Sequence, residues 1–463
     1  MDQPVKTQAE YTALLHTVLG VRYGDAPRAF VHTYGCQGNV ADGERIKGML
    51  AEMGYLFTDT VESADLVLYN TCAVREHAED RVFGNVGALK NRKAARPGMV
   101  VALCGCMMQQ PRVAEKIRRS YPFVDLVFGT HVIHRLPELL YRTLCGRNRV
   151  FELPDEAGSI TEGLPVVRDS SFKAFLPVMY GCNNFCSYCI VPYVRGRERS
   201  RMVEAVLEEA RSLVEAGYRD ITLLGQNVNS YGKDLETPVP FAQLLREINA
   251  IPGDFRIRFM TSHPKDCTRE LLDAMADCEK VAKHLHLPFQ SGNDRVLKEM
   301  NRRYTREQYL ELIRYARQVM PELSLTSDVI VGFPGETYEA FQDTLSLVEE
   351  VGFTSLFTFI FSPREGTPAA KMPDPVSREE KGRWFRELTD LQERVASARN
   401  QKLLGKRFRV LVEGPGKKAG LLAGRTEGNL VIEFPGGDSL IGEFVEVVVT
   451  EALAWILRGQ MEI

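Results

Sequence analysis

Short apolar runs alternate with longer amphipathic segments through most of the chain. In the first third these runs are AFVHTYG, ADLVLYN, MVVALCG and VDLVFGT. Each is followed by a stretch with helical spacing of apolar residues, and this alternation predicts a parallel sheet covered by helices. We assign residues 1–29 to an N-terminal extension, 30–150 to this α/β domain, and the acidic, Pro- and Gly-containing segment 151–170 to a linker.

The same alternation resumes at residue 171 and ends near residue 400. Its strand-like runs are FLPVMYG, DITLLGQ, FRIRFMTS, HLHLPFQS, LTSDVIVGF and LFTFIFS. Six such units predict an incomplete (β/α)6 barrel over 171–400 rather than a closed eightfold barrel. Beyond it, residues 401–463 contain short β-rich runs divided by glycines, which predicts a small all-β barrel.

Composition excludes some classes of protein. With 463 residues, 44% hydrophobic and 26% charged, the chain is typical of a globular protein with several domains. It has neither an apolar run long enough for a membrane helix nor an export signal, so we expect a cytoplasmic protein. A net charge of −3 argues against a uniformly basic nucleic-acid binder but permits local basic patches. In a reducing compartment, the ten cysteines are better candidates for metal ligands or reactive thiols than for disulfides.

Three cysteines follow the first strand-like run of the predicted barrel. Cys182, Cys186 and Cys189 have the spacing CxxxCxxC, in a loop that leaves the carboxyl end of a strand, where barrel enzymes build their sites. Three thiolates can hold three corners of a cubane iron-sulfur cluster and leave the fourth iron open to another ligand. A structural zinc site is the alternative, but it needs a fourth nearby Cys or His, and none follows before His263.

A second set of cysteines lies in the N-terminal domain. Cys36, Cys72 and Cys106 each follow a strand-like run. Because the carboxyl ends of consecutive parallel strands meet at one edge of a sheet, we expect these thiols to converge on a second metal site, again with one corner open. A buried core thiol is the alternative for any one of them. Cys104 is a possible substitute ligand, although its place within the run favours a core position.

The motifs around both sets resemble those of the radical S-adenosylmethionine methylthiotransferase family. The CxxxCxxC spacing is similar to that of the radical superfamily, and the segments TYGCQGN, NTCAVREHAEDRVFGNVGALK and GCMMQQ resemble the N-terminal domain of methylthiotransferases. NTCAVREHAE looks most like the branch that forms 2-methylthio-dimethylallyladenosine in tRNA. In the first motif, Gly38 and Gly43 stand where the family commonly has methionine and serine.

The resemblance implies an enzyme with two [4Fe-4S] clusters and S-adenosylmethionine. The barrel cluster would generate a 5′-deoxyadenosyl radical, and the auxiliary N-terminal cluster would supply sulfur. The implied reaction is methylthiolation of carbon 2 of dimethylallyl(isopentenyl)-adenosine next to the anticodon. Alternative substrates are a threonylcarbamoyl-adenosine in tRNA and an aspartate of a ribosomal protein. The alternative from another class is a non-catalytic iron-sulfur protein that binds RNA.

Polar residues at the later strand ends are candidates for binding S-adenosylmethionine, whose carboxylate, amine and ribose need donors and acceptors. Tyr188 matches the superfamily's aromatic position near the adenine. The full candidate set is Tyr188, Gln226, Asn227, Asn229, Ser262, Gln290, Ser291, Asp328 and Gly332. No catalytic residue is assigned beyond the cluster ligands.

Basic residues in two places are candidates for RNA phosphate contacts. One is RGRERSR, directly after the cluster loop, and the other is the C-terminal segment, which resembles the TRAM domain, a small RNA-binding barrel. The alternatives are a solvated face and a cap on the larger barrel. The candidates are Arg195, Arg197, Arg199, Arg201, Lys406, Arg407, Arg409 and Arg425. Expected partners are tRNA, an electron donor such as flavodoxin or ferredoxin, and a sulfur source or iron-sulfur carrier, with a monomeric protein and no membrane.

Overall fold

The computed structural model describes residues 6–24, 27–74, 76–156 and 158–462. The chain folds into two compact units. The first contains the chain up to Asp169 together with two later segments, Tyr180–Asn183 and Ile190–Arg199. The second contains Ser170–Met179, Asn184–Cys189 and the chain from Ser200 onward. The chain therefore passes between the units within the CxxxCxxC loop, so that Cys182 is counted with the first unit.

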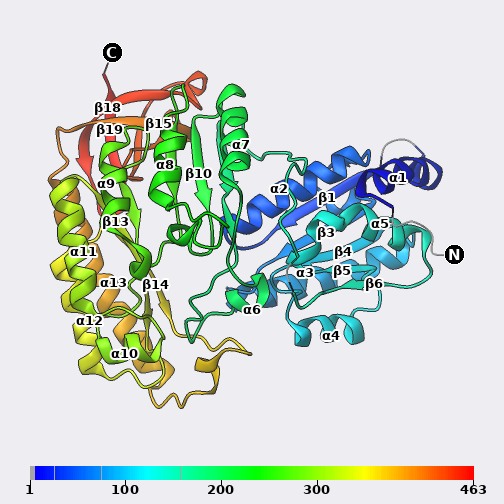
Figure 1. Ribbon diagram of the computed structural model, residues 1–463, viewed down its shortest axis with the longest axis horizontal. Coiled ribbons are helices and arrows are strands. Elements are labelled where there is room, and N and C mark those ends of the chain that lie inside the picture. Colours follow the sequence, from blue (N-terminus) through cyan, green and yellow to red (C-terminus); the bar gives the residue numbers. More distant parts are fainter. Residues whose placement is uncertain (1–5, 25–26, 75, 157, 463) are drawn as a thin grey trace. The chain divides into compact units, whose positions relative to one another are not determined.

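A six-stranded parallel sheet forms the centre of the first unit (Figure 1). In spatial order its strands are β2 (Leu56–Phe57), β1 (Arg28–Thr33), β3 (Leu66–Thr71), β4 (Val100–Gly105), β5 (Leu126–Phe128) and β6 (Val150–Glu152). Strands β1, β3, β4 and β5 coincide with the four predicted runs, which confirms the parallel α/β architecture. The edge strands β2 and β6 have two and three residues, too few to show a period along the sequence.

Helices cover both faces of this sheet. They are α1 (Gln8–Tyr23), α2 (Gln37–Glu52), α3 (Glu76–Ala95), α4 (Pro111–Ser120), α5 (Leu136–Cys145) and the short α6 (Val191–Arg195), with 3-10 turns η1 (Val61–Ser63) and η2 (Thr130–Arg135). Alternate residues of β4 enter two different cores. Ala102 packs with residues of α1, α2 and α5, whereas Val101 packs with residues of α3 and α4. Burial on both faces explains why the strands are continuous apolar runs.

The predicted extension and linker both pack on the first unit. Helix α1 begins after Thr7 in a capping box with Glu10 and buries Leu15 and Leu19. Strand β6 extends two residues into the segment predicted as a linker. At the end of that segment, Arg168 pairs with the buried Glu44 of α2 at 3.0 Å.

The second unit begins with six parallel strands in chain order, as the sequence predicts. They are β7 (Lys173–Pro177), β10 (Asp220–Leu224), β11 (Arg256–Phe259), β12 (His284–His286), β13 (Ser324–Val331) and β14 (Ser355–Ile360). A parallel bridge between Ile257 and Val281 joins the first three strands to the last three. The short strands β8 (Met179–Tyr180) and β9 (Arg199–Ser200) pair where the chain changes unit.

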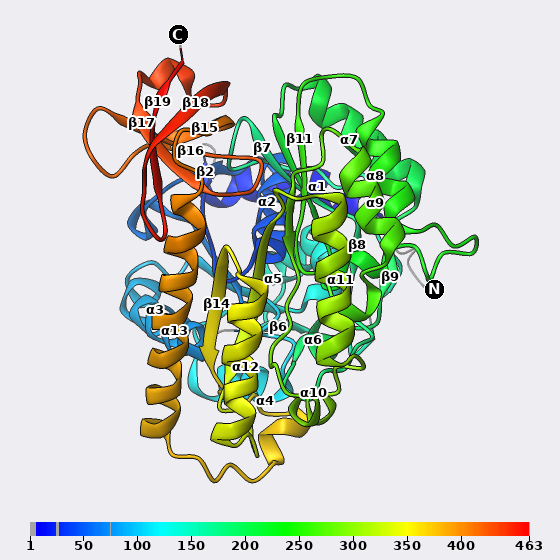
Figure 2. The same cartoon turned by 90° about the vertical axis from the view of Figure 1, so that its left-hand side faces the viewer.

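Helices line the outer side of these strands (Figure 2). They are α7 (Val203–Glu215), α8 (Phe241–Asn249), α9 (Arg269–Asp277), α10 (Asp294–Glu299), α11 (Arg306–Val319), α12 (Tyr338–Val351) and α13 (Arg378–Gln401), with η3 (Val228–Ser230), η4 (Pro264–Asp266) and η5 (Pro368–Lys371). Strand residues such as Leu223 and Leu285 share one core with helix residues such as Leu244 and Ile313. This shared core makes the open barrel a rigid platform for the loops at its strand ends.

A closed five-stranded barrel ends the second unit and confirms the predicted all-β segment. In order around the barrel its strands are β15 (Arg407–Pro415), β16 (Leu421–Arg425), β17 (Val431–Pro435), β19 (Leu457–Met461) and β18 (Phe444–Ala452), with η6 (Asp438–Leu440). Val410, Ile432 and Phe434 are among the fully buried residues of its core. Closure leaves no unpaired strand edge.

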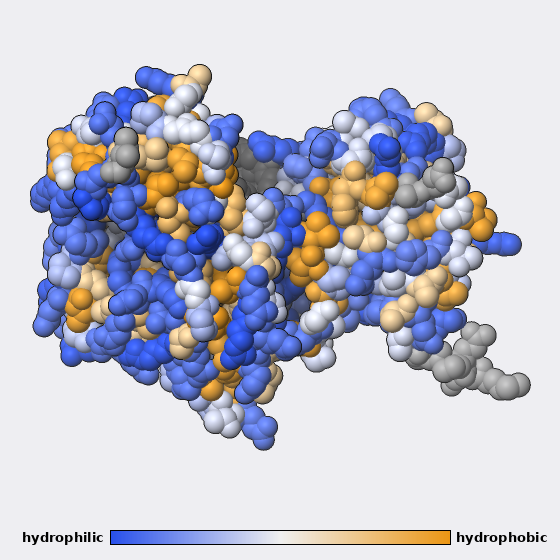
Figure 3. All heavy atoms as spheres, turned by 90° about the horizontal axis from the view of Figure 1, so that it is seen from above, coloured by the Kyte–Doolittle hydropathy of each residue, from blue (hydrophilic) through white to orange (hydrophobic). Residues whose placement is uncertain are grey.

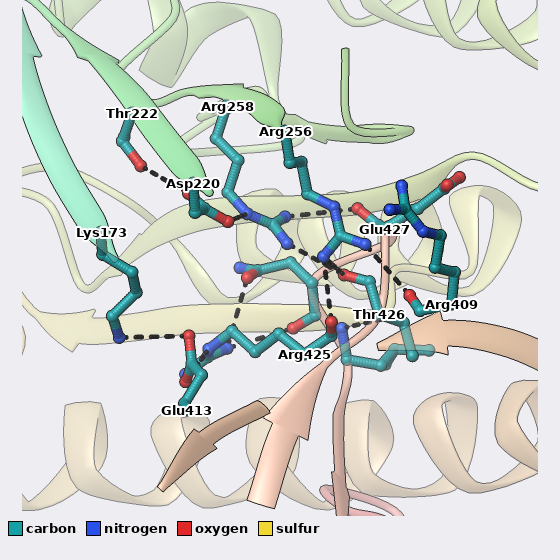
Figure 4. Close-up of polar contacts among 12 residues, drawn as sticks. Lys173, Asp220, Thr222, Arg256, Arg258, Arg409, Glu413, Arg425, Thr426 and Glu427 are labelled. Atoms are coloured by element: carbon teal, nitrogen blue, oxygen red, sulfur yellow. Dashed lines mark hydrogen bonds and ion pairs between the residues drawn. The ribbon is translucent and has the colours of Figure 1, made fainter. Parts of the chain in front are cut away.

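Two buried arginines of β11 hold the small barrel against the amino ends of the larger barrel's strands (Figure 4). Arg258 pairs with Asp220 at 2.8 Å and donates to the carbonyls of Thr426 and Glu427. Arg256 donates to the carbonyls of Arg425 and Thr426, and to that of Arg409. Burial lowers the pKa of Arg256 to about 10, so this guanidinium stays charged at neutral pH. The small barrel is therefore fixed at the end opposite the CxxxCxxC loop.

Replacing Arg258 with methionine should loosen this junction. The change leaves Asp220 buried without its partner, which costs about 3–5 kcal/mol. We expect faster release of the small barrel in limited proteolysis and a lower melting temperature. Arg409→Met is the matched control, because its ion pair with Asp254 is exposed and contributes only about 0–1 kcal/mol. Equal effects of the two changes would contradict the anchoring role of Arg258.

Polar side chains dominate the face shown in Figure 3, where apolar residues form small separate patches. Among the residues that the structure describes, none of the helices combines the length and apolar character that crossing a membrane requires.

Candidate metal centres and cofactor site

The sheet of the first unit brings together the N-terminal cysteines. Cys72 and Cys106 directly follow the neighbouring strands β3 and β4, and Cys36 is the N-cap residue of α2, three residues after β1. Both Cys36 Sγ and Cys106 Sγ lie 3.7 Å from Oδ1 of Asn39. Gly35, with φ of 107°, passes so close to Cys72 that a Cβ there would lie 2.6 Å from its sulfur. The three thiols thus share one edge of the sheet, as the strand pattern predicts.

Of the two departures from the family motif, Gly38 and Gly43, the structure gives a local reason for Gly43. A Cβ at Gly43 would lie 2.4 Å from Oγ1 of Thr33 on β1. The glycine therefore leaves room for the threonine, and the position of Cys36 does not depend on a side chain at residue 43.

A buried arginine lies against these cysteines. Arg195 Nε donates to Cys106 Sγ at 3.1 Å, and its Nη2 donates to Asn39 Oδ1 at 3.0 Å and to Asp42 Oδ2 at 2.6 Å. Arg195 and Asp42 are 6% and 4% exposed. Burial opposes the charge on the guanidinium, yet Asp42, Cys106 and Cys36 hold the pKa of Arg195 well above its usual value. A permanent positive charge therefore lies beside the thiols.

The thiol of Cys106 is protonated when it binds no metal. Burial raises the pKa of Cys106 to about 12; the neighbouring Cys36 and Cys72 reinforce this shift and Arg195 opposes it. Among the described residues, no group of three or more Cys, His, Asp and Glu side chains converges closely enough to hold a single metal ion. A metal group that fits this site would be bound by three thiolates, each of which follows a different strand. It would also carry negative charge that Arg195 can neutralise. A [4Fe-4S] cluster has both properties.

The loop of the barrel cysteines is divided between the units. In the first unit, Gly181 has φ of 79°, and a Cβ there would lie 1.9 Å from the carbonyl oxygen of Arg197, so only glycine suits the position before Cys182. In the second unit, Arg302 is 4% exposed, and its Nη1 lies 3.5 Å from Cys186 Sγ. Its Nη2 donates to the carbonyl of Pro288 at 2.6 Å, which fixes the guanidinium. Each cysteine set therefore has one buried arginine touching a sulfur.

Two predicted cofactor residues have unused polar atoms. Ser262 follows β11 and Gln290 follows β12, and both are buried at the carboxyl ends of these strands. Ser262 Oγ and Gln290 Oε1 have no hydrogen-bond partner among the described residues. Thr261 and Gln290 also adopt positive φ values of 69° and 67°, a strained conformation that is enriched at functional sites. A polar cofactor would satisfy these atoms, so the site suits S-adenosylmethionine.

Other predicted cofactor residues have partners within the protein. Asn229 exchanges hydrogen bonds of 2.9 Å with the backbone of His263, which ties the loops after β10 and β11 together. Asn227 donates to Asp266 at 2.8 Å. Gly332 follows β13, and its N–H donates to the buried Glu336 at 2.6 Å. Burial raises the pKa of Glu336 to about 7.

The remaining cofactor candidates lie at the same strand ends. Asp328 is on β13, with a carboxylate oxygen 3.5 Å from His286 Nε2. Ser291 Oγ accepts from the N–H of Asn293, and Gln226 follows β10. Tyr188 packs beside Phe333, and burial raises its pKa well above the usual tyrosine value. These placements agree with a cofactor cradle at the carboxyl ends of the strands.

Comparison with known proteins identifies the family of the chain. The profile of the Radical SAM superfamily matches residues 176–348, that of "Uncharacterized protein family UPF0004" matches 28–129, and that of the TRAM domain matches 401–461. A tRNA-2-methylthio-N(6)-dimethylallyladenosine synthase of Acetivibrio thermocellus is 51% identical over 442 residues, which cover 95% of this chain and 92% of the relative. The chain belongs to the tRNA-2-methylthio-N(6)-dimethylallyladenosine synthase family. This membership confirms the resemblance found in the sequence.

Other relatives of this synthase family extend the comparison. The synthase of Alkaliphilus oremlandii is 51% identical over 439 residues, covering 95% of this chain and 93% of the relative. Among solved structures, the radical S-adenosylmethionine methyltransferase TsrM from Kitasatospora setae, with cobalamin and a [4Fe-4S] cluster bound, has a TM-score of 0.54 at 16% identity. That match covers 74% of each chain. It shows the fold alone.

In this member of the synthase family, the predicted RNA-binding arginines divide into buried and exposed side chains. Arg195 contacts Cys106, and Arg201 is buried in the second unit, where it donates to the carbonyl of Pro177 and to Glu209. Their placement differs from the phosphate-facing role predicted for them. Arg197 is exposed and Arg199 is half-buried, so these two remain candidates.

The candidates on the small barrel are all engaged in ion pairs. Lys406 pairs with Glu322, Arg407 with Glu462, Arg409 with Asp254 and Arg425 with Glu413. A phosphate would therefore have to replace a carboxylate at each position. Their contact with RNA stays a prediction.

Sequence reasoning missed three kinds of functional residue. Asn39 and Asp42 lie three and six residues after Cys36, and the start of a helix at Cys36 could have placed Asn39 beside its sulfur. Arg302 lies in the loop between α10 and α11, far from Cys186 in the sequence, and no local pattern indicates their contact. The role of Arg195 was obscured by the basic run around it.

Proposed function

We propose that this chain adds a methylthio group to carbon 2 of dimethylallyladenosine in tRNA. The observation that carries the proposal is the pair of cysteine sets, each with a buried arginine against one sulfur, in a chain 51% identical to a dimethylallyladenosine synthase. When bound, the barrel cluster and S-adenosylmethionine supply a radical that removes the hydrogen from carbon 2. Sulfur for the new bond would come from the N-terminal site, and a second S-adenosylmethionine would supply the methyl group.

The chain's own residues prepare the two sites for this chemistry. Ser262 and Gln290 offer buried polar atoms to S-adenosylmethionine, and Arg302 orients Cys186 through a guanidinium held by Pro288. Arg195 offsets the negative charge that collects when Cys106 and its partners become thiolates. The segment after Cys189 continues directly into Arg195, so one stretch of chain serves both cysteine sets.

Substrate and partners follow from the reaction. The target adenosine has to leave its stack in the RNA to reach a radical, at a cost of a few kcal/mol. Arg197 and Arg199 are the expected phosphate contacts near this position. Reductive cleavage needs an electron donor such as flavodoxin or ferredoxin, and each product removes one sulfur that a donor must restore. We expect the protein to act as a cytoplasmic monomer.

Two tRNA substrates test this assignment. The reconstituted protein is incubated anaerobically with S-adenosylmethionine, reductant, and tRNA that carries either a dimethylallyl or a threonylcarbamoyl group on the target adenosine. We expect 5′-deoxyadenosine and a methylthio nucleoside with the dimethylallyl substrate alone. A methylthio product only from the threonylcarbamoyl substrate would refute the substrate assignment. Failure to cleave S-adenosylmethionine with either tRNA would favour the non-catalytic alternative.

A further inference from the structure

The last strand of the larger barrel exposes two phenylalanines on one face. Phe357 and Phe359 of β14 are 49% and 51% exposed. Leu356, which precedes Phe357, joins the core that the strands share with the helices. Because successive side chains of a strand point to opposite faces, Phe357 and Phe359 lie on the inner side of the strands, away from these helices. Ligand sites are lined mainly by apolar and aromatic side chains of this kind.

The neighbouring strand adds two side chains to this surface. In the parallel register of β13 and β14, Asp328 is paired with Phe357, and Ile330 is paired with Phe359. Val329 lies between Asp328 and Ile330 and joins the core under the helices, so its two neighbours lie on the inner side. We call Asp328, Ile330, Phe357 and Phe359 the inner-face set. It combines one carboxylate with an apolar wall.

Backbone hydrogen bonds place the inner-face set beside the expected cofactor site. The N–H of Gln290 donates to the carbonyl of Asp328 at 2.9 Å, and the N–H of Ile330 donates to the carbonyl of Gln290 at 3.0 Å. Gln290 is a cofactor candidate whose Oε1 has no partner among the described residues. Ile330 also packs against the same small core as Tyr188, a second cofactor candidate. A molecule on the inner-face set would therefore lie next to the cofactor, where the reaction needs the substrate.

The polar member of the set can accept a hydrogen bond. The side chain of Asp328 is 30% exposed, and its Oδ1 lies 3.5 Å from Nε2 of His286. The His286 ring also packs edge-on against Phe357, with 5.7 Å between the ring centroids. A carboxylate can accept about four hydrogen bonds, so this contact leaves capacity for a ligand N–H. The set thus suits a planar base that carries an apolar group next to an N–H.

We propose that the inner-face set selects the N6-dimethylallyl group of the adenosine. Phe357, Phe359 and Ile330 bury its branched apolar chain, and Asp328 accepts the hydrogen bond from the remaining N6–H. The inference rests on the proposed function, because it names the residues by which the enzyme chooses its substrate. A threonylcarbamoyl group carries a carboxylate, which Asp328 repels and which the phenylalanines cannot solvate. Asp328 is thereby assigned to the substrate instead of the cofactor.

The contribution of the dimethylallyl group to RNA binding tests the phenylalanines. The cluster-reconstituted protein, saturated with unreactive S-adenosylhomocysteine, is titrated with a fluorescent anticodon stem-loop that carries either an unmodified or a dimethylallyl adenosine. We expect the dimethylallyl RNA to bind at least about tenfold more tightly. Phe357→Ser and Phe359→Ser should each reduce this ratio about fourfold, the effect of returning about one methylene to water.

An exposed phenylalanine elsewhere provides the matched control. Phe57 lies on β2 of the first unit and is 41% exposed, so Phe57→Ser should leave the ratio unchanged. Binding of the unmodified RNA by each variant shows that the variant is folded. A parental ratio in both Phe357→Ser and Phe359→Ser would overturn the proposal. So would an equal reduction in Phe57→Ser.

Replacing Asp328 with asparagine separates its charge from its hydrogen bond. The amide oxygen of the variant can still accept from the N6–H, but the negative charge is gone. We expect the preference for dimethylallyl over threonylcarbamoyl RNA to fall about tenfold, the effect of removing one nearby like charge in a partly screened site. Asp390→Asn is the matched control, because Asp390 is exposed on α13. An unchanged preference in Asp328→Asn, or a tenfold weaker affinity for S-adenosylhomocysteine, would refute the role of Asp328.

The binding and turnover results separate this inference from the proposed function. If the unmodified enzyme forms methylthio product from dimethylallyl tRNA while all these variants keep the parental ratios, the inner-face assignment fails and the proposed function stands. If the variants lose selectivity as expected but the unmodified enzyme forms no methylthio product, the proposed function fails and the inner-face set still recognises the dimethylallyl group.

Discussion

Replacing Cys72 with alanine is expected to abolish methylthiolation of tRNA while formation of 5′-deoxyadenosine continues. Cys72 is 2% exposed and packs against the backbone of Gly35, so the thiol occupies a fixed place beside Cys36. Loss of a group that merely orients a metal ligand already costs about 10–100-fold in affinity or activity, and loss of a ligand costs more. The barrel site keeps all its residues in this variant, so cleavage of S-adenosylmethionine should persist.

Two further substitutions make this result specific. Cys186→Ala removes a cysteine of the barrel site and should eliminate both products. Cys104→Ala is the matched control, since Cys104 lies two residues before Cys106 but packs into the apolar core under α1, α2 and α5. It should cost about 1 kcal/mol of stability and leave both products in place. Equal loss of 5′-deoxyadenosine in Cys72→Ala and Cys186→Ala would contradict separate roles for the two sites.

The second large effect is expected from Arg195→Gln. Both members of the Arg195–Asp42 pair are more than nine-tenths buried, with 2.6 Å between Nη2 and Oδ2. Removing the guanidinium leaves a buried carboxylate without its partner and should cost about 3–5 kcal/mol. Amide hydrogen exchange of α2 and β4 in the iron-free protein measures this loss of stability. Arg197→Gln, an exposed change on the same loop, should alter exchange very little.

A double variant separates the fold from the metal site. Asp42→Asn combined with Arg195→Gln removes both charges and should restore most of the lost stability. It should not restore the electrostatics of the cysteines, because the positive charge beside Cys106 is still missing. A reconstituted N-terminal cluster should therefore have a lower reduction potential than in the parent protein. A parental potential in the double variant would contradict the role given to Arg195.

The proximity of the N-terminal cysteines could be predicted because it follows from regular structure. Cys36, Cys72 and Cys106 follow strands that are recognisable as apolar runs, and the edge of a parallel sheet collects strand ends whatever the loops do. The same rule placed Ser262 and Gln290 among the candidates for binding the cofactor, and each has a buried polar atom without a partner among the described residues. The spacing of apolar residues along the chain is therefore enough to place a side chain when the arrangement of parallel strands alone determines its position.

Other contacts of the candidate residues join distant parts of the sequence. Arg195 belongs to a basic run that is typical of a solvated surface, but it ends helix α6 of the first unit and contacts Cys106, 89 residues away in the sequence. Arg409 pairs with Asp254, across 155 residues. The amide of Asn229, a candidate for binding the cofactor, exchanges hydrogen bonds with the backbone of His263, 34 residues away. Such pairings arise from tertiary packing, which no local pattern encodes.

The most direct test of the account follows the sulfur atom itself. The enzyme is reconstituted with heavy-isotope sulfide, freed of unbound sulfide, and given dimethylallyl-modified tRNA, S-adenosylmethionine and reductant for a single turnover under anaerobic conditions. Mass spectrometry of the nucleosides should show a methylthio group on the dimethylallyladenosine that carries the heavy sulfur, and no such product from Cys72→Ala. A methylthio product without the heavy isotope, or no product beside abundant 5′-deoxyadenosine, would contradict the central claim.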